Sequence, residues 1–597
     1  MGLFGKKKKN RPTKQRYIPI SEKQYEELYA FYEKLGLSEE QCRALSDQCF
    51  GFEVIVEKEA QYVDDWELPV RSVRSYMSEA SARGRMMGAP GAAMGRAMPM
   101  MKMAVSDACM PMAEACPPMM GMPAVEMMEE CREPEPEFNS AETHHAEEIE
   151  NATPLDRPQI IFSANVNTAS WAYVRNRVML GNRVEPDFVR VEEIINSYPY
   201  KLKKPKDGSL FRVSTQMGPC PWDPESELLM VGIKGKKADK GVAQNLALLV
   251  DVSGSMEDRW VLVQMSVMAI ISKMGKGDHV SIIAYSDNTT TVVENLECSD
   301  MDKCVKAVLS IEGIGGCTRG SEGMENAYRF LQANFDPEGN NRVFVFTDGD
   351  FNFGVTSEGG LSEMIRKKRE TGIYLSIVGF GQSNFKDNKM EAMAQNGNGN
   401  YTFVASPGDI LDFLWERLVS SLVTVAKDVK ISVELNPQLV KEYRLIGYDA
   451  RVLTQQEFND TEKAVDGIGS KHNVVAMIQL KRGKAQQQYQ TRYVTPQTGG
   501  PADELAFIEI HYKTPEGENC EYTQPITLGD LEKEPDLNFQ IAVLLAAFGL
   551  YVKDSDYKGK LDQAMLKDLL EKVTAASEGG MKEKYGHLEI LRAALKR

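Results

Sequence analysis

Three oxygen-bearing side chains stand at alternate positions in one short stretch of this 597-residue chain. They are Asp251, Ser253 and Ser255, in the sequence NLALLVDVSGSM that starts at Asn245. The apolar run up to Val250 predicts a strand buried on both faces, which puts Asp251 at the carboxyl end of that strand. Hydroxyl and carboxylate oxygens suit a hard divalent cation such as Mg²⁺, which needs near-octahedral oxygen coordination. The stretch therefore predicts part of a metal site.

Further ligands are expected at other strand ends of the same sheet, because parallel sheets bind ligands outside the carboxyl ends of their strands. Residues 315–318 form a glycine-rich loop that carries the hydroxyl of Thr318. The apolar pattern at 341–347, NRVFVFT, predicts a second buried strand, and Asp348 follows it. The predicted metal ligands are two carboxylates and three hydroxyls: Asp251, Ser253, Ser255, Thr318 and Asp348. The alternative is that Asp251 caps the next helix and Asp348 lies in an ordinary turn.

Two carboxylates that meet at one edge of a sheet repel one another. At an effective dielectric near 20, two like charges ~4 Å apart cost on the order of several kcal/mol, and a bound cation removes that cost. Asp350 and Asn352 follow Asp348 on the same loop. They either orient water around the metal and shape the rim where a partner binds, or form an Asx turn. The sequence leaves these alternatives open.

The three elements together resemble the metal-ion-dependent adhesion site of von Willebrand factor type A domains. The shared features are Asp-x-Ser-x-Ser at 251–255, the Gly-Gly-x-Thr loop and a strand that ends in Thr-Asp-Gly at 347–349. The resemblance implies that the two serines and Thr318 bind the metal directly, whereas the two aspartates act mostly through water. It implies Mg²⁺, and Mn²⁺ accepts the same oxygen ligands. Cys317 departs slightly from the family's pattern, in which serine or glycine would be unremarkable.

Strands alternate with helices from about residue 244 to 427, which predicts an α/β fold with a doubly wound parallel sheet. This is the Rossmann-like architecture that the resemblance to type A domains also implies. A helix is expected at 260–274, after the metal-binding loop, and another at 410–426 closes the domain. In the usual strand order the first and fourth strands are neighbours, so that Asp251 and Asp348 meet at one rim.

Patterns on both sides of this domain resemble two companion domains of one bacterial family. Residues 155–243, with the sequences SANVNTASWAYVRNRV and GPCPWDP, resemble the domain found immediately before the type A domain, and we predict a small α+β domain there. Residues 428–535 alternate apolar and polar positions, which predicts a β-sandwich with Tyr489–Val494 among its strands. The run NFQIAVLLAAFGLYVK lies in a helical segment expected at 536–597. The resemblance covers residues from about 155 to 597.

The residues before 155 divide into a basic tail at 1–20, a helical hairpin at 21–70 and a linker at 71–154. Two capping boxes mark the starts of the two hairpin helices. The linker is rich in Met, Pro and Glu and lacks helical spacing, so we predict that it is disordered. We therefore expect that residues 1 to about 150 can be removed without unfolding the rest of the chain.

The composition argues against nucleic acid as the main partner. The net charge is -16, whereas binding to phosphates needs a basic surface. The ten cysteines show no Cys-x-x-Cys pair and no regular spacing, so we interpret them as free thiols in a reducing compartment. The start of the chain lacks the apolar core of a signal peptide, and the longest apolar run, at 539–552, is too short for a membrane span. We expect a cytoplasmic protein.

No catalytic motif accompanies the predicted metal site in the sequence. There is no Walker loop and no Gly-x-Ser-x-Gly elbow, and Ser253 and Ser255 lack a base. We therefore predict no enzyme but a metal-dependent protein-binding scaffold, whose metal binds an Asp or Glu carboxylate of a protein partner. Specificity is expected from Asp350, Asn352 and residues 256–259. The alternatives are a subunit of a chelatase-like ATPase assembly and a surface adhesion protein, and the oligomeric state is left open.

Overall fold

The computed structural model describes most of the chain apart from its amino-terminal region and several loops. The described ranges are 22–49, 148–164, 167, 169–206, 208–237, 242–286, 288–311, 320–349, 358–381, 387–410, 424–449, 452–461, 465, 467–470, 472–486, 501–514, 517–531, 534–577 and 586–596. Some predictions fall outside these ranges. They are the basic tail, the greater part of the linker, the expected strand Tyr489–Val494, the metal ligand Thr318 and the rim residues Asp350 and Asn352.

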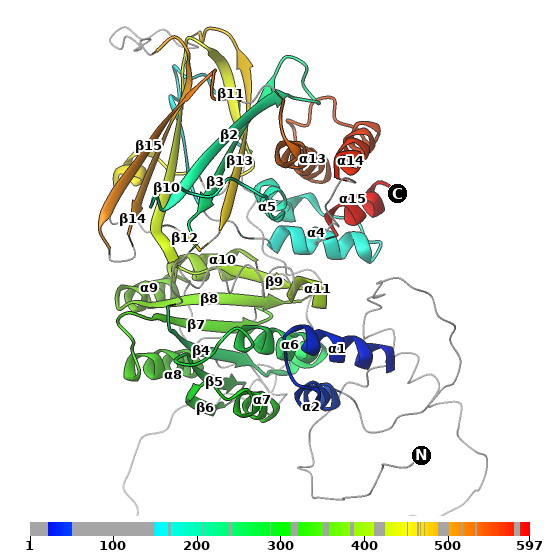
Figure 1. Ribbon diagram of the computed structural model, residues 1–597, viewed down its shortest axis with the longest axis vertical. Helices are drawn as coiled ribbons and strands as arrows, with labels where there is room; N and C mark the ends of the chain where they lie inside the picture. The colour runs from blue at the N-terminus through cyan, green and yellow to red at the C-terminus, as the bar shows by residue number, and fades with distance from the viewer. Residues whose placement is uncertain are drawn as a thin grey trace, which may run out of the picture. The chain divides into compact units, whose positions relative to one another are not determined.

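A six-stranded sheet lies at the core of the central domain, residues 242–410 (Figure 1). Its strands are β4 (Gln244–Asp251), β5 (His279–Tyr285), β6 (Thr289–Glu297), β7 (Asn340–Thr347), β8 (Ile373–Phe380) and β9 (Tyr401–Val404). They lie in the order β6-β5-β4-β7-β8-β9, and all are parallel except β6, which is antiparallel to β5. Every residue of β4 and β7 is buried, as expected for parallel strands covered on both faces. The predicted α/β fold class is confirmed.

Helices cover both faces of this sheet. Their bounds are α6 (Trp260–Ile271), α7 (Met301–Leu309), α8 (Gly320–Ala333), α9 (Glu358–Glu370), α10 (Asp387–Asn396) and α11 (Pro407–Asp409). On one face, α6 and α7 bury Leu246 and Leu248 of β4. On the other face, α8 packs against β4, whereas α9 and α10 pack against β8, and all three helices share a core with Ala247 and Leu249. Alternate residues of one strand therefore contribute to two separate hydrophobic cores.

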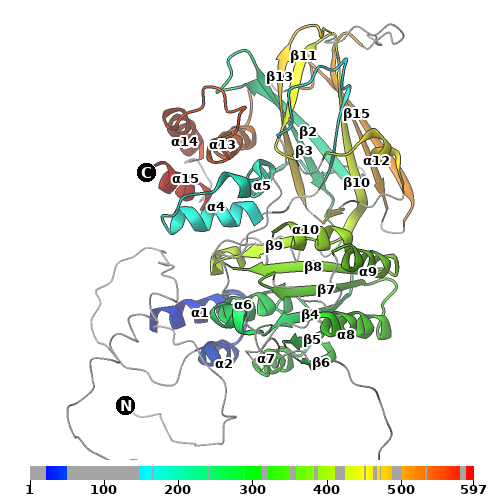
Figure 2. The same cartoon turned by 180° about the vertical axis from the view of Figure 1, so that it is seen from behind.

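Two further helices, α1 (Glu22–Lys34) and α2 (Glu39–Cys49), form a hairpin beside α6 and α7 (Figure 2). Apolar hairpin residues belong to the same core as the central domain; they are Leu28, Phe31, Tyr32, Leu35, Leu37, Cys42 and Leu45. The hydroxyl of Tyr32 donates a hydrogen bond to Oε1 of Gln264 in α6 over 3.2 Å, and neither side chain is exposed. Removal of residues 1 to about 150 would therefore uncover apolar core, contrary to the expectation that they are dispensable.

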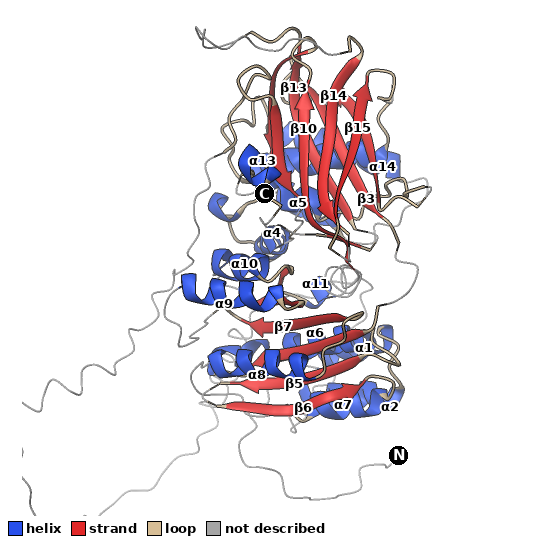
Figure 3. Cartoon of the chain, turned by 90° about the vertical axis from the view of Figure 1, so that its left-hand side faces the viewer, coloured by secondary structure: helices blue, strands red, loops and turns tan. Residues whose placement is uncertain are grey.

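Two antiparallel sheets form a second module, the sandwich module (Figure 3). Its strands are β1 (Gln159–Ser163), β2 (Phe211–Pro219), β3 (Glu227–Gly235), β10 (Thr424–Leu435), β11 (Val440–Ile446), β12 (Ile468–Gly469), β13 (Asn473–Arg482), β14 (Glu504–Lys513) and β15 (Asn519–Thr527). One sheet has the order β1-β10-β14-β15, with β12 paired to β10, and the other has the order β11-β13-β3-β2. Apolar side chains from both sheets, among them Leu229 and Ile431, share one core.

Segments from both sides of the central domain build the sandwich module. β1 pairs with β10, and β3 pairs with β13, so that each sheet contains strands from before and after the central domain. The sequence predicts two separate companion domains, at 155–243 and 428–535, but the structure interleaves their strands. The physical reason is that β1 and the β2–β3 pair have too few strands to bury their apolar faces alone.

A layer of helices covers the sheet β11-β13-β3-β2. Its members are α4 (Ala169–Met179), α5 (Val191–Asn196), α13 (Leu537–Val552), α14 (Gln563–Ser577) and α15 (His587–Leu595). Buried residues of these helices join a core with Met230 of β3 and Met477 of β13. Trp171 of α4 stacks on His587 of α15, with ring centroids 4.4 Å apart. The helical segment expected at the end of the chain is thus present, and most residues of its first helix are buried.

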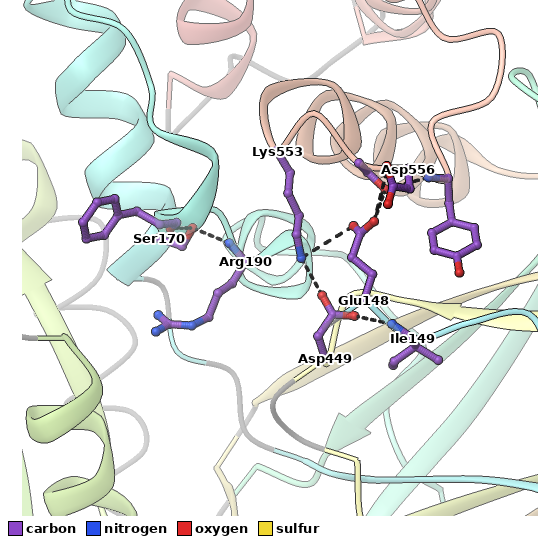
Figure 4. Close-up of polar contacts among 10 residues, drawn as sticks. Glu148, Ile149, Ser170, Arg190, Asp449, Lys553 and Asp556 are labelled. Carbon is purple, nitrogen blue, oxygen red and sulfur yellow. Dashed lines mark hydrogen bonds and ion pairs between the residues drawn. The ribbon is translucent and has the colours of Figure 1, made fainter. Parts of the chain in front are cut away.

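A partly buried ion cluster joins three distant parts of the sandwich module (Figure 4). Lys553, just after α13, lies 2.6 Å from Asp449 and 3.6 Å from Glu148. Glu148 also accepts a hydrogen bond from the hydroxyl of Ser555 at 3.0 Å. The sequence predicts residues 148–154 as the end of a disordered linker, but in the structure Lys553 and Ser555 hold Glu148 in place. The local sequence does not reveal this contact, because both partners lie far along the chain.

Strand β10 begins at Thr424, inside the segment 410–426 that the sequence predicts to be helical. Thr424 pairs with Gly469 of β12. The β-branched residues Thr424 and Val425 fit a strand well, and tertiary pairing therefore overrides the helical pattern at this point. Residues 411–423 lie outside the described part of the chain.

Candidate metal centre

The loop after β4 turns at the carboxyl rim of the six-stranded sheet. The backbone N–H of Val252 still donates to the carbonyl of Tyr285 at 2.9 Å, so the loop leaves β4 only after Asp251. Ser253 is the N-cap residue of the 3-10 helix η3 (Gly254–Arg259), which leads directly into α6. The alternative that Asp251 caps the following helix is therefore not what the structure shows.

Asp251 has no exposed surface, and fixed donors contact both of its carboxylate oxygens. Oδ1 accepts the backbone N–H of Ser253 at 2.9 Å. Oδ2 accepts the hydroxyl of Tyr285 at 3.1 Å and that of Thr347 at 3.3 Å. Tyr285 and Thr347 end β5 and β7, the two strands that flank β4. Neighbouring strands thus fix the orientation of this carboxylate.

Burial raises the pKa of Asp251 to about 6, because the charged form loses its hydration. Hydrogen bonds from Ser253 lower the pKa, and the nearby carboxylate of Asp348 raises it. The two aspartates therefore interact across β4 and β7, which are parallel neighbours as predicted. A divalent cation between them would replace lost hydration and offset their repulsion.

The two serine hydroxyls lie side by side, with 3.1 Å between Oγ of Ser253 and Oγ of Ser255. Adjacent ligands of an octahedral Mg²⁺, each about 2.0–2.1 Å from the ion, stand roughly 2.9 Å apart. The observed spacing therefore fits two neighbouring coordination positions. Ser253 is buried, whereas Ser255 is exposed at the rim.

Asp348 follows β7 and is almost fully buried. Its Oδ2 lies 2.9 Å from Nη1 of Arg259. The same nitrogen donates to the backbone carbonyl of Ser255 at 2.7 Å. Arg259 ends η3, and 20% of its side chain is exposed. The guanidinium therefore brings a positive charge to the carboxylate that we expect to face the metal.

The structure brings four of the five predicted ligands to one rim: Asp251, Ser253, Ser255 and Asp348. The fifth, Thr318, lies outside the described residues, as do Asp350 and Asn352. Sequence reasoning did not find the roles of Tyr285 and Thr347 as donors to Asp251. Tyr285 is the last residue of β5 and Thr347 is the last residue of β7, and both strands are neighbours of β4. A comparison of the last residues of neighbouring strands in the predicted sheet could therefore have found them.

The donor set fits a hard divalent cation. Its members are carboxylates and hydroxyls, and two of the hydroxyls have the spacing of adjacent ligands. A softer metal prefers thiolate or imidazole ligands, and the described partners of these four side chains include neither. When bound, such a cation would supply an electrophilic position that a further oxygen can occupy.

Family models match three segments of the chain. Residues 245–415 match the von Willebrand factor type A domain, residues 137–230 match a model described as von Willebrand factor, and residues 420–594 match the carboxyl-terminal part of the uncharacterized protein YfbK. YfbK of Escherichia coli (strain K12) is 30% identical over 443 residues, which cover 72% of this chain and 77% of YfbK. This chain belongs to the YfbK family. The central domain of this YfbK-family protein is the type A domain, and the other two matched segments flank it.

Other similarities of this YfbK-family chain are more distant. The inter-alpha-trypsin inhibitor heavy chain H3 of Mesocricetus auratus is 26% identical over 31% of this chain and 22% of that protein. A solved von Willebrand factor type A protein from Catenulispora acidiphila is 14% identical, covers 64% of this chain and 88% of that chain, and has a TM-score of 0.36. Proximal thread matrix protein 1 from the mussel byssus, solved with a zinc-occupied MIDAS motif, is 19% identical over 30% of this chain and 46% of that chain, with a TM-score of 0.26.

Proteins with type A domains are commonly protein-interaction or adhesion scaffolds, and the YfbK-family chain shares this domain. Among its described residues, no helix combines the length and the apolar character that a membrane crossing needs.

Proposed function

We propose that this protein is a metal-dependent protein-binding scaffold without catalytic activity of its own. In this proposal the central domain binds an Asp or Glu carboxylate of a protein partner through a divalent cation, Mg²⁺ or Mn²⁺. The observation that carries it is the fully buried Asp251 near Asp348, at a rim where two serine hydroxyls stand at the spacing of adjacent ligands. Arg259 pairs with Asp348, whereas the described donors to Asp251 are all neutral, so its buried charge is costly unless a cation is bound nearby.

The ligand count supports a position for the partner. Ser253 and Ser255 would bind the cation directly, and Thr318 is the predicted third hydroxyl. Asp251 and Asp348 would act mostly through water, since donors from the protein already hold their oxygens. An octahedral ion has six positions, so these residues leave room for one further oxygen. A carboxylate is the strongest oxygen donor that a partner protein offers.

Arg259 adds a second positive charge to the same rim. Its guanidinium lies 2.9 Å from Asp348 and is partly exposed. A carboxylate that approaches a cation bound there would also meet this guanidinium. The combination favours acidic loops over neutral ones, because both positive charges attract the incoming group.

Affinity purification from the native organism tests the proposal. Partners that bind in Mg²⁺ should be lost when a chelator is added, and the same partners should be lost with Asp348→Ala. Glu370→Ala is the matched control, because Glu370 is an exposed carboxylate in the last turn of α9, at the opposite end of the sheet. If both the chelator and Asp348→Ala leave the full set of partners bound, the metal does not mediate binding.

The same purification separates the alternatives. An ATPase among the metal-dependent partners, with an activity that depends on this chain, would favour the chelatase-like assembly. Cell fractionation addresses location: we propose a cytoplasmic protein, and recovery of the chain in the envelope fraction would instead favour surface adhesion.

A further inference from the structure

A second group of metal-binding side chain types lies on the sandwich module. Glu509 and His511 stand two residues apart on β14, so both point to the same face of the sheet. Glu521 of β15 stands opposite His511 in the antiparallel register. The other face of β14 carries Ile508 and Ile510, which are buried in the core. Three potential ligands therefore share the outer face of the sheet, and we refer to them as the His511 cluster.

The three side chains of the His511 cluster converge. Nε2 of His511 is 2.7 Å from Oε1 of Glu509, and one ligand atom from each of the three residues lies within 4.8 Å of the others. The ligands of a tetrahedral Zn²⁺, each about 2.0–2.2 Å from the ion, are roughly 3.4 Å apart. Small side-chain rotations would therefore suffice to surround an ion. Glu521 is exposed and the other two are partly exposed, so an ion can enter from solvent.

Two lysines flank the His511 cluster, and both have acceptors elsewhere. Lys430 of β10 is opposite His511 in the register, but its ammonium donates to the backbone carbonyl of Glu457 at 2.8 Å. Lys513 forms a 2.8 Å ion pair with Asp428. These contacts direct both ammonium groups to other oxygens. A divalent cation in the cluster would thus have two carboxylates to balance its charge.

The ring of Phe458 fixes the orientation of the His511 imidazole. The two rings are stacked, with centroids 4.2 Å apart and 21° between their planes. Phe458 belongs to the short helix α12 (Gln455–Asn459), whose start is closed by a capping box between Thr454 and Glu457. Neighbours that hold the ring in place are typical of a metal-binding imidazole. The alternative is a simple ion pair between His511 and Glu509. Such a partly exposed pair adds little to stability, whether or not its side chains are held in place.

We propose that Glu509, His511 and Glu521 form a second metal site, one that prefers Zn²⁺ or a similar d-block cation to Mg²⁺. The imidazole ligand is the reason, since Mg²⁺ prefers oxygen ligands alone. Three protein ligands leave at least one position of a tetrahedral ion open to water or another donor. The site links β14 to β15, which ends its sheet, so a bound ion holds the edge strand in place. This inference does not depend on the proposed function of the central domain.

Zinc titration of the intact chain tests the inference. All proteins carry Asp251→Ala, so that Zn²⁺ at the rim of the central domain does not contribute to the signal. In calorimetry, His511→Asn should weaken Zn²⁺ binding at this site by at least about tenfold, and Glu521→Gln should also weaken it. Glu518→Gln is the matched control, because Glu518 is exposed on the turn between β14 and β15. It should bind Zn²⁺ as the parent does.

Thermal melting supplies the second measurement. Zn²⁺ should raise the melting temperature of the parent and of Glu518→Gln, but not that of His511→Asn. Circular dichroism without metal shows whether each variant is folded, and Glu521→Gln, at an exposed edge position, keeps the test valid if His511→Asn does not fold. Equal affinity and stoichiometry for the parent, His511→Asn and Glu521→Gln would overturn the inference, as would the absence of Zn²⁺ binding in the parent.

Discussion

Asp251 carries its charge at a position without exposed surface. Its pKa is raised from 3.8 to about 6 in the folded protein, so the folded state binds this proton more tightly than the unfolded chain does. The stability that comes from this group is fully present below pH 3.8 and is lost as the pH rises through about 6. The shift corresponds to on the order of 3 kcal/mol. A divalent cation would offset this loss at neutral pH.

Asp251→Asn should therefore stabilise the metal-free protein at pH 8, by up to about 3 kcal/mol, because it removes the buried charge and keeps the shape of the side chain. The parent should gain more stability from Mg²⁺ at pH 8 than at pH 5, since a proton competes with the metal at the lower pH. Urea unfolding at both pH values, with and without Mg²⁺, measures this. Mg²⁺ should have little effect on the variant, and stabilisation equal to that of the parent would rule out Asp251 as part of the site.

Arg259 and a metal ion compete for the same carboxylate. Because the guanidinium contacts Asp348 at 2.9 Å, Arg259→Gln should raise the affinity for Mg²⁺ several-fold, through loss of both competition and charge repulsion. Arg366→Gln removes the same charge from an exposed position on α9 and is the control. Calorimetry with each variant gives the affinities. An affinity that falls in Arg259→Gln would mean that the guanidinium helps to hold Asp348 in its metal-binding orientation.

At the scale of elements, the hairpin of α1 and α2 completes a hydrophobic core of the central domain. It covers α6, the helix that follows the metal-binding loop, and buries the hydrogen bond between Tyr32 and Gln264. None of the three family models matches the hairpin, since the first matched segment begins at residue 137. In this chain the hairpin covers an apolar face of the type A domain.

Leu45→Ala should destabilise the central domain by about 2–5 kcal/mol, because Leu45 is fully buried in the shared core and the substitution leaves a cavity. Hydrogen exchange should then be faster in α6 and α7 as well as in the hairpin. Glu33→Ala, at an exposed position of α1, is the control and should change little. Unchanged exchange in α6 would show that the hairpin contributes nothing to the stability of the domain.

At the scale of the whole molecule, the central domain is an insertion between two halves of the sandwich module. Its chain enters after β3 and leaves before β10, and strands from both sides pair in each sheet. Lys553 adds an ionic link between Glu148 and Asp449, which lie on opposite sides of the insertion in the sequence. The sandwich module therefore cannot be completed by either flanking segment alone.

Fragments of residues 148–237 and 424–597 should associate when they are produced together, and neither should fold by itself. The reason is that each fragment alone leaves strands with unpaired edges and uncovered apolar faces. Copurification and cooperative thermal melting of the pair provide the measurement. A fragment 424–597 that melts cooperatively without its partner would show that this segment is a complete domain, as the sequence predicts.

Local patterns sufficed for the elements that carry the candidate metal centre. The buried strands that end at Asp251 and Thr347 each contain a short apolar run, LALLV and VFVF, and the carboxylates and hydroxyls follow these runs. The parallel order that brings the two strands together follows from the alternation of strands and helices. Such features depend on residues close together in the chain, and this is why the sequence by itself could predict that four candidate ligand side chains lie at one rim; that they bind a metal stays a prediction.

The tertiary structure alone decided which distant segments pair. The interleaved strands of the sandwich module, the place of the hairpin and the start of β10 all depend on contacts between segments far apart in the sequence. The same holds for the bond from Arg259 to Asp348 and for the His511 cluster, which exists only because β14 and β15 align Glu521 with His511. The alternation of side chains along a strand indicates which residues share a face, but it does not specify which strand lies next to it or in which register the two strands pair.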